Sequence, residues 1–198
     1  MKHTIFIIAA LLLFAIGARA ESPMQGVKGT TEKVLLLLKD PKVQGDSKKE
    51  ERRQLVRGAM EGRFAWEESA RACLGRHWTK RTPAEKAEFV KLFSGFLKDN
   101  YSDKIATYYS DLDKVDYQGE KIIDDCASVK LVLTTKAKVD HPVEYRMEKA
   151  GDDWKVYDVV IEGVSLVKNY RDQFDAIIAK SAYEGLIKEI KSKQVSTP

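Results

Sequence analysis

Cysteine, histidine and the short motifs of common enzymes are scarce in this sequence. The 198 residues include 2 cysteines and 3 histidines. His3, His77 and His141 have no cysteine or histidine neighbours at the spacing of zinc ligands. Neither the G-x-x-x-x-G-K-[ST] phosphate loop nor the G-x-S-x-G turn of serine hydrolases occurs. We therefore expect no metal site, no cofactor and no nucleotide chemistry in this chain.

The two cysteines, Cys73 and Cys126, allow two interpretations. A disulfide between them would close a loop of about 50 residues and stabilise the fold by about 4 kcal/mol. Alternatively, both are separate buried thiols that pack as small apolar side chains. A nucleophilic role for Cys126 is disfavoured, because Asp124 and Asp125 precede it and negative charge raises a thiol pKa.

Neither sign of charge dominates. The chain has 34 Lys and Arg against 30 Asp and Glu, a net charge of +4. Without the first 20 residues, which hold Lys2 and Arg19 and no acid, the balance is 32 against 30, or +2. Nucleic-acid-binding proteins need a basic face and a clear excess of positive charge, so we expect no nucleic-acid partner.

Long hydrophobic runs are absent except at the N-terminus. Residues 1–20 begin with Lys2 and His3, continue with an apolar stretch over 5–16, and end in Ala18-Arg19-Ala20. This pattern predicts a cleavable secretory signal peptide, with an uncleaved anchor as the less favoured alternative. The remaining residues, 21–198, have a length typical of one domain, which we expect to be exported and soluble.

The periodicity of the apolar residues divides the domain into three parts. Residues 21–112 are mainly helical, with helix starts predicted by Ser47 followed by Glu50 and by Thr82-Pro83-Ala84-Glu85. Residues 113–165 alternate as strands do, 166–193 return to helical spacing, and 194–198 form a tail without pattern. The apolar stripe that begins at Phe89 fits either core packing or a ligand site.

The strands predict the fold class. Alternation over 129–134, 143–148 and 154–164, with a tight turn at 151–153, indicates consecutive antiparallel strands. On strict alternation Trp154, Val156 and Val160 share one face of the last strand. We expect an α+β fold in which a curved antiparallel sheet of about four strands is wrapped by N- and C-terminal helices. Such a sheet can enclose a cavity, although alternation alone leaves open whether side chains fill it.

Two acids interrupt the apolar last strand. Asp158 and Glu162 precede Arg171 in the sequence. One interpretation is a small-molecule enzyme in which Asp158 is a catalytic carboxylate in the cavity and Tyr145 or Tyr157 polarises a carbonyl. The other, which we favour, is a structural pair between one acid and Arg171.

Two longer blocks resemble a known family. GRHW at 75–78 is followed by TPAE at 82–85 and EFVKLF at 88–93. VEYR at 143–146 is followed by WKVYDVVIEGVSLV at 154–167 and NYRDQF at 169–174. In this order, over nearly the whole domain, the blocks resemble the MlaC or toluene-tolerance family of periplasmic phospholipid carriers in Gram-negative bacteria.

This resemblance implies a non-enzymatic function. Such a carrier holds phospholipid acyl chains in an apolar pocket and leaves the head group in water. Its implied partners are an inner-membrane ABC transporter complex and an outer-membrane lipoprotein associated with a porin, and its implied role is to maintain outer-membrane lipid asymmetry. The two cysteines are not explained by it.

The pattern also suggests which side chains point inward. The expected lipid-binding residues are Phe93, Leu97, Tyr101, Leu133, Tyr145, Val160, Val164 and Tyr170. Arg146 and Arg171 are candidates for contact with a head-group phosphate, although the structural pair is the stronger interpretation for Arg171.

Overall fold

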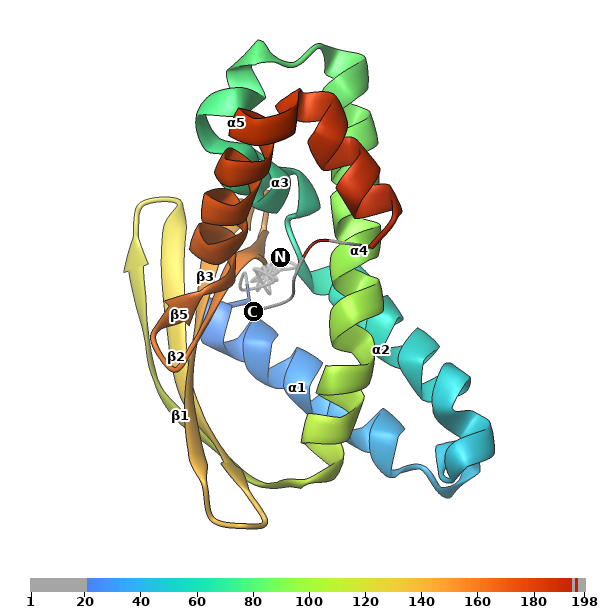
Figure 1. Ribbon diagram of the computed structural model, residues 1–198. Coiled ribbons are helices and arrows are strands. Elements are labelled where there is room, and N and C mark those ends of the chain that lie inside the picture. The colour runs from blue at the N-terminus through green and yellow to red at the C-terminus, as the bar shows by residue number, and fades with distance from the viewer. Residues whose placement is uncertain (1–20, 194, 196–198) are drawn as a thin grey trace, which may run out of the picture.

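Helices come first in this chain, a sheet follows, and one long helix completes the fold (Figure 1). The computed structural model describes residues 21–193 and Val195. The predicted signal peptide at 1–20 and nearly all of the predicted tail lie outside the described residues. Among the residues that are described, no helix is both long and apolar enough to cross a bilayer.

Five α-helices form within the described residues. They are α1 (Pro23–Lys39), α2 (Lys49–Arg63), α3 (Trp66–Leu74), α4 (Pro83–Ser110) and α5 (Leu166–Lys191). Short 3-10 turns at Pro41–Val43, Asp46–Lys48 and Gly75–Lys80 join them. Helix α5 bends at Ser181–Ala182, and its second half runs back beside α4 in Figure 1.

The sheet is antiparallel throughout. Its strands are β1 (Leu112–Ile123), β2 (Cys126–Thr135), β3 (Asp140–Ala150), β4 (Asp153–Ile161) and β5 (Val164–Ser165), paired in the order β1-β2-β3-β4-β5. The predicted fold class is confirmed, with a two-residue fifth strand added to the four expected. Glu162 and Gly163, with φ of 51° and 82°, form a turn that splits the predicted strand 154–164 in two.

Helix starts follow local hydrogen bonding. The Thr82 hydroxyl caps α4 by accepting a hydrogen bond from the Glu85 backbone N–H, and the Thr82 backbone N–H donates to the Glu85 carboxylate. The predicted capping box is therefore confirmed. The capping box predicted at Ser47 is wrong, because Ser47 lies inside a 3-10 turn and Lys48 precedes α2 without a side-chain cap. A second capping box, between Ser22 and Gln25, starts α1 and was not predicted from the sequence.

A β-bulge changes which side chains of β4 face the helices. Met147 pairs with Val156, but the preceding residue of β3, Arg146, pairs with Asp158, so Tyr157 is an extra residue on β4. Because one extra residue reverses the alternation, Val156 and Val159 lie on the same face. The predicted placement of Val160 with Trp154 and Val156 is therefore wrong.

Helix α4 belongs to two different environments. Its first half packs Phe89, Phe93 and Phe96 into an aromatic core with α3 and α5. There Phe93 meets the rings of Tyr170 and Phe174 edge to face, with centroids 5.7 and 5.6 Å apart. Its second half leaves this core and crosses α1 and α2, opposite the sheet. The Phe89 stripe is thus core packing in its first half.

Candidate functional site

The second half of α4 forms one wall of a cavity. Leu97, Tyr101, Ile105 and Tyr108 recur at spacings of four, four and three residues and face inward as one stripe. Lys104 lies along the same stripe. The apolar stripe that begins at Phe89 therefore continues along α4, but toward a cavity instead of a solid core.

The sheet supplies the opposite wall. Leu133 from β2, Val143 and Tyr145 from β3, and Val159 and Ile161 from β4 all line the cavity. Tyr145 pairs with Val159, and Val143 with Ile161, so these side chains stand beside one another on one face. The bulge at Tyr157 is what brings Val159 and Ile161 to this face.

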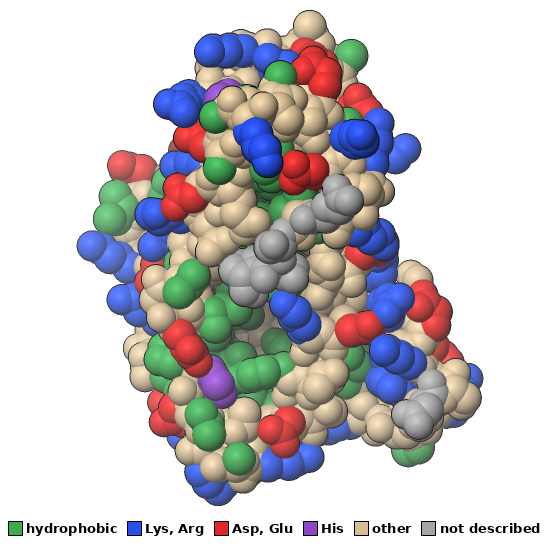
Figure 2. Space-filling model, in the orientation of Figure 1, with side chains coloured by type: hydrophobic (Ala, Val, Ile, Leu, Met, Phe, Trp, Pro, Cys, Tyr) green, Lys and Arg blue, Asp and Glu red, His purple; other side chains and the backbone are tan. Residues whose placement is uncertain are grey.

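Helices α1 and α2 close the remaining side. Val27 and Val34 come from α1, and Val56 and Met60 come from α2, all four of them buried. The cavity has a volume of about 500 Å³ and is partly open to solvent. In Figure 2 this opening is a hollow lined by hydrophobic side chains, with a histidine and charged groups near its edge. A volume of this size suits a small apolar or amphipathic ligand.

The closed end of the cavity contains a neutralised cation. Arg63 donates hydrogen bonds to Thr30 Oγ1 at 2.9 Å, to Asp153 Oδ1 at 3.1 Å and to the Trp154 carbonyl at 3.0 Å. Glu21 lies 3.6 Å from the same guanidinium. Because two carboxylates and a carbonyl already satisfy it, Arg63 closes the end of the cavity without offering a free charge there.

Two phenols add polarity without adding charge. Burial raises the pKa of Tyr145 well above its usual value, and the neighbouring Tyr109 and Tyr117 raise it further. Burial likewise raises the pKa of Tyr109. Both groups therefore stay neutral near pH 7, and the cavity wall remains suited to hydrocarbon.

The structure separates the predicted lining residues into two groups. Leu97, Tyr101, Leu133, Tyr145 and Val164 line the cavity. Phe93 and Tyr170 do not, because both are completely enclosed in the aromatic core. Val160 does not either, because the bulge turns it to the other face. For the five residues that line the cavity, contact with lipid remains a prediction.

Several lining residues were missed by sequence reasoning. For those in α1 and in the second half of α4 the signal was present as helical stripes, but a stripe does not say which partner it faces. The missed residues include two polar ones on α4, Lys104 and Tyr108, and two apolar ones on β4, Val156 and Val159.

The predicted head-group arginines and the acid Asp158 lie outside the cavity lining. Arg146 contacts Asp158 at 3.2 Å and Glu144 at 3.3 Å. Arg171 donates to the Ala72 carbonyl at 2.6 Å. Asp158 therefore forms a structural ion pair with Arg146, and the prediction that an acid pairs with Arg171 is wrong. The alternative in which Asp158 is a carboxylate in the cavity is wrong as well.

The cysteines are free thiols, so the disulfide alternative is contradicted. Cys73 is buried with Sγ 3.8 Å from the Val167 carbonyl, and burial raises the pKa of its thiol. Cys126 is exposed at the start of β2, so the alternative of two buried thiols holds for Cys73 alone.

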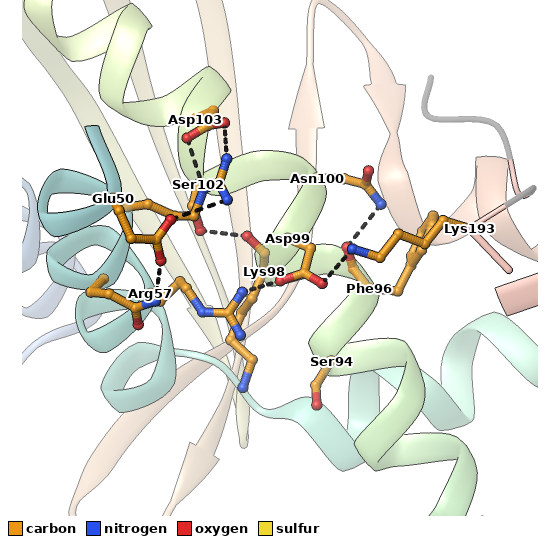
Figure 3. Close-up of polar contacts among 12 residues, drawn as sticks. Glu50, Arg57, Ser94, Phe96, Lys98, Asp99, Asn100, Ser102, Asp103 and Lys193 are labelled. Atoms are coloured by element: carbon orange, nitrogen blue, oxygen red, sulfur yellow. Dashed lines mark hydrogen bonds and ion pairs between the residues drawn. The ribbon is translucent and has the colours of Figure 1, made fainter. Parts of the chain in front are cut away.

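A row of ion pairs joins α2 to α4 on the outer side of the cavity (Figure 3). Arg57 binds Asp99, and Arg53 binds Asp103, one helical turn further along. Lys193, just beyond α5, also contacts Asp99 at 3.1 Å. Burial alone would raise the pKa of Asp99, but hydrogen bonds from Arg57 and Lys193 hold it below its usual value. A hydrogen bond from Arg53 lowers the pKa of Asp103.

These lowered pKa values predict acid sensitivity of the α2–α4 contact. We expect the double variant Asp99→Asn, Asp103→Asn to lose about 1 kcal/mol of unfolding free energy at pH 7, because the pairs are partly exposed. A carboxyl with a lowered folded pKa stabilises the fold above its unfolded pKa of about 3.9 and ceases to do so as pH falls through the folded pKa. The gap between wild type and variant should therefore close below about pH 4.

Urea midpoints measured from neutral pH down to about pH 2.5 check this, with Glu32→Gln as an exposed-site control. A gap that keeps its size, or grows, in acid would contradict the assignment of Asp99 and Asp103 as stabilising carboxylates.

The fold and the cavity define an α+β protein in which a curved antiparallel sheet and helices surround a mostly apolar, partly open cavity. The family model described as MlaC protein matches residues 28–192. This chain therefore belongs to the MlaC family, and the resemblance seen in the sequence is confirmed.

Relatives and a solved structure agree with this membership. The chain is 32% identical over 97 residues to the toluene tolerance protein ttg2D of Pseudomonas putida, an alignment covering 48% of this chain and 44% of that protein. It is 23% identical over 123 residues to the intermembrane phospholipid transport system binding protein MlaC of Haemophilus influenzae, covering 60% and 56%. The chain thus spans about half the length of the curated relatives it matches.

One solved structure that this chain resembles is the phospholipid-binding protein from Ralstonia solanacearum, solved in complex with a phospholipid. Its TM-score is 0.74 at 25% sequence identity, and the alignment covers 85% of this chain and 94% of the neighbour.

Proposed function

We propose that this protein binds phospholipid by its acyl chains in the cavity and carries it between membranes. The observation that carries the proposal is the half-open cavity of about 500 Å³ with an almost wholly apolar wall. Membership of the MlaC family and a structural neighbour solved with a phospholipid support it. The protein acts as a carrier and not as an enzyme, and needs no cofactor besides the lipid it carries.

Energetics favour a cavity over a surface groove for this task. Each buried methylene contributes about 0.8 kcal/mol, so burying about 15 methylenes contributes about 12 kcal/mol. An acyl chain bound on an open surface would remain largely in contact with water and would lose most of this favourable free energy. The enclosed walls of α1, α2, α4 and the sheet supply the required burial.

The proposal includes a location and two docking partners. The protein works in the periplasm after export by its N-terminal segment. It exchanges lipid with an inner-membrane ABC transporter complex and with an outer-membrane lipoprotein–porin complex, and so maintains outer-membrane lipid asymmetry. Transfer between two apolar sites is nearly balanced in free energy, so the carrier itself needs no nucleotide and the partner supplies the energy.

The test is organic extraction of the purified protein followed by mass spectrometry of the extract. We expect phospholipid in stoichiometric amount, and its acyl content gives the number of chains that the cavity holds. An extract without lipid, repeated after incubation with phospholipid vesicles, would refute the carrier function.

A further inference from the structure

The opening of the cavity is marked by the lining residues that are themselves exposed. Within the described part of the chain these are Lys104 on α4, Ile161 at the end of β4 and Val164 in β5. Ile161 is 38% exposed and Val164 is 50% exposed. A ligand whose chains occupy the cavity must place its polar end between α4 and this end of the sheet.

The charges around the cavity have one sign. Arg63, Lys104 and His141 contribute to the lining, and none of the aspartates and glutamates among residues 21–193 does. Arg63 is already neutralised by Glu21 and Asp153, as described above. His141 Nδ1 lies 2.6 Å from Glu162 Oε1, so it too has an acidic partner.

Lys104 differs from the other two basic residues. It forms no ion pair with a carboxylate among the described residues, and its ammonium group lies 5.0 Å from the centre of the Tyr101 ring. A cation over an aromatic face keeps its full charge and is held in place by the ring. The opening therefore presents one positioned cation to the polar end of a ligand.

Tyr108, one turn beyond Lys104 on α4, supplies a second polar group. Its hydroxyl is buried and has no hydrogen-bond partner among the described residues. Its ring packs edge to face against His141, with centroids 5.2 Å apart. Buried hydroxyls are almost always paired in folded proteins, so an unpaired one in a binding cavity indicates a hydrogen bond completed by ligand or water.

We propose that Lys104 and Tyr108 select the phosphate-bearing end of the carried lipid. The Lys104 ammonium binds the anionic phosphodiester oxygen at the opening, and the Tyr108 hydroxyl donates to an oxygen of the same polar group. This inference rests on the proposed lipid-carrier function and adds a specificity to it. The protein retains anionic phospholipids in preference to uncharged diacylglycerols with the same acyl chains.

The full chain is loaded from vesicles that contain equal amounts of phosphatidylglycerol and diacylglycerol, then purified, extracted and analysed by mass spectrometry. We expect wild type to be enriched in phosphatidylglycerol. Lys104→Met should lower the ratio of the two lipids about tenfold, the size expected for one charge-assisted hydrogen bond. Lys91→Met, which removes an exposed lysine of α4 outside the cavity lining, should leave the ratio unchanged.

Tyr108→Phe separates binding from a structural role. Removing an unpaired buried hydroxyl should keep or raise the thermal midpoint of the protein without lipid, while lowering the same lipid ratio several-fold. A lower midpoint with an unchanged ratio would assign the hydroxyl to the fold and overturn its role in selection.

The outcomes distinguish this inference from the carrier function. Stoichiometric lipid with the same ratio in wild type and Lys104→Met would overturn the selection by Lys104 and leave the carrier function standing. No bound lipid in wild type would refute both. A Lys104-dependent thermal stabilisation by millimolar inorganic phosphate alone would assign the site to free phosphate and overturn the head-group assignment.

Discussion

Leu133→Arg is expected to remove most of the bound phospholipid. Leu133 lines the cavity from near the end of β2 and is only 7% exposed, beside Val115 and His141 on the neighbouring strands. A guanidinium there must either enter the hydrocarbon region, at a cost of several kcal/mol, or fill the space that acyl chains occupy. We expect the lipid recovered per protein, measured by extraction and mass spectrometry, to fall on the order of tenfold or more.

Val132→Arg is the matched control. Val132 is the preceding residue on β2, so its side chain points to the other face of the sheet, outside the cavity. The Val132→Arg variant should fold and carry lipid as the wild-type protein does. Leu133→Trp fills the cavity without a charge and covers the case in which the arginine variant does not fold. Normal lipid content in a folded Leu133→Arg or Leu133→Trp variant would contradict the assignment of this wall.

Asp158→Ala is expected to cause a large loss of stability. The carboxylate is almost fully buried and accepts hydrogen bonds from Val167 N at 3.0 Å, Ser165 Oγ at 2.7 Å and Arg146 Nη1 at 3.2 Å. Its removal leaves a buried backbone N–H in the first turn of α5 without its acceptor, and leaves the Arg146 guanidinium with Glu144 as its remaining acidic partner. We expect a loss of about 2–4 kcal/mol, or roughly 5–15 °C in thermal midpoint.

Two further variants test this explanation of Asp158. Asp158→Asn keeps one acceptor oxygen and the shape of the side chain, so it should lose less than Asp158→Ala. Glu144→Gln removes the other acid beside Arg146. Because the Arg146 side chain is half-exposed, this substitution should lower the unfolding free energy by under about 1 kcal/mol. Thermal and urea unfolding measure all three. An Asp158→Ala protein as stable as wild type would show that these hydrogen bonds do not anchor α5.

The fold was largely predictable because its signals are local. The capping box at Thr82, the helical spacing after Phe89 and the alternation in β2 and β3 each depend on residues close together in the sequence. The prediction at Ser47 failed for a local reason too, because the chain there forms a 3-10 turn before α2 begins. Residue type alone does not distinguish an α-helix N-cap, as at Thr82, from a 3-10 turn, as at Ser47.

The cavity was only partly predictable because its position depends on packing between distant elements. Phe93 and Leu97 belong to the same stripe of α4, yet Phe93 packs against α5 and Leu97 lines the cavity. Val160 failed because a bulge is set by the pairing of two strands, which alternation in one strand does not reveal. Lys104 went unnoticed because an exposed lysine on a helix is ordinary until the cavity beside it is known.

The course of α4 ties one wall of the cavity to the core of the protein. One continuous helix of 28 residues is fixed at its first half in a tightly packed aromatic core and forms a wall of the cavity with its second half. That wall moves only if the helix bends or the core is disturbed. The facing helix α2 packs its buried Val56 and Met60 in a cluster with the second half of α4, and the partly exposed ion pairs outside this cluster contribute little each and are screened by salt. The width of the cavity is therefore fixed mainly by apolar packing on both of these walls.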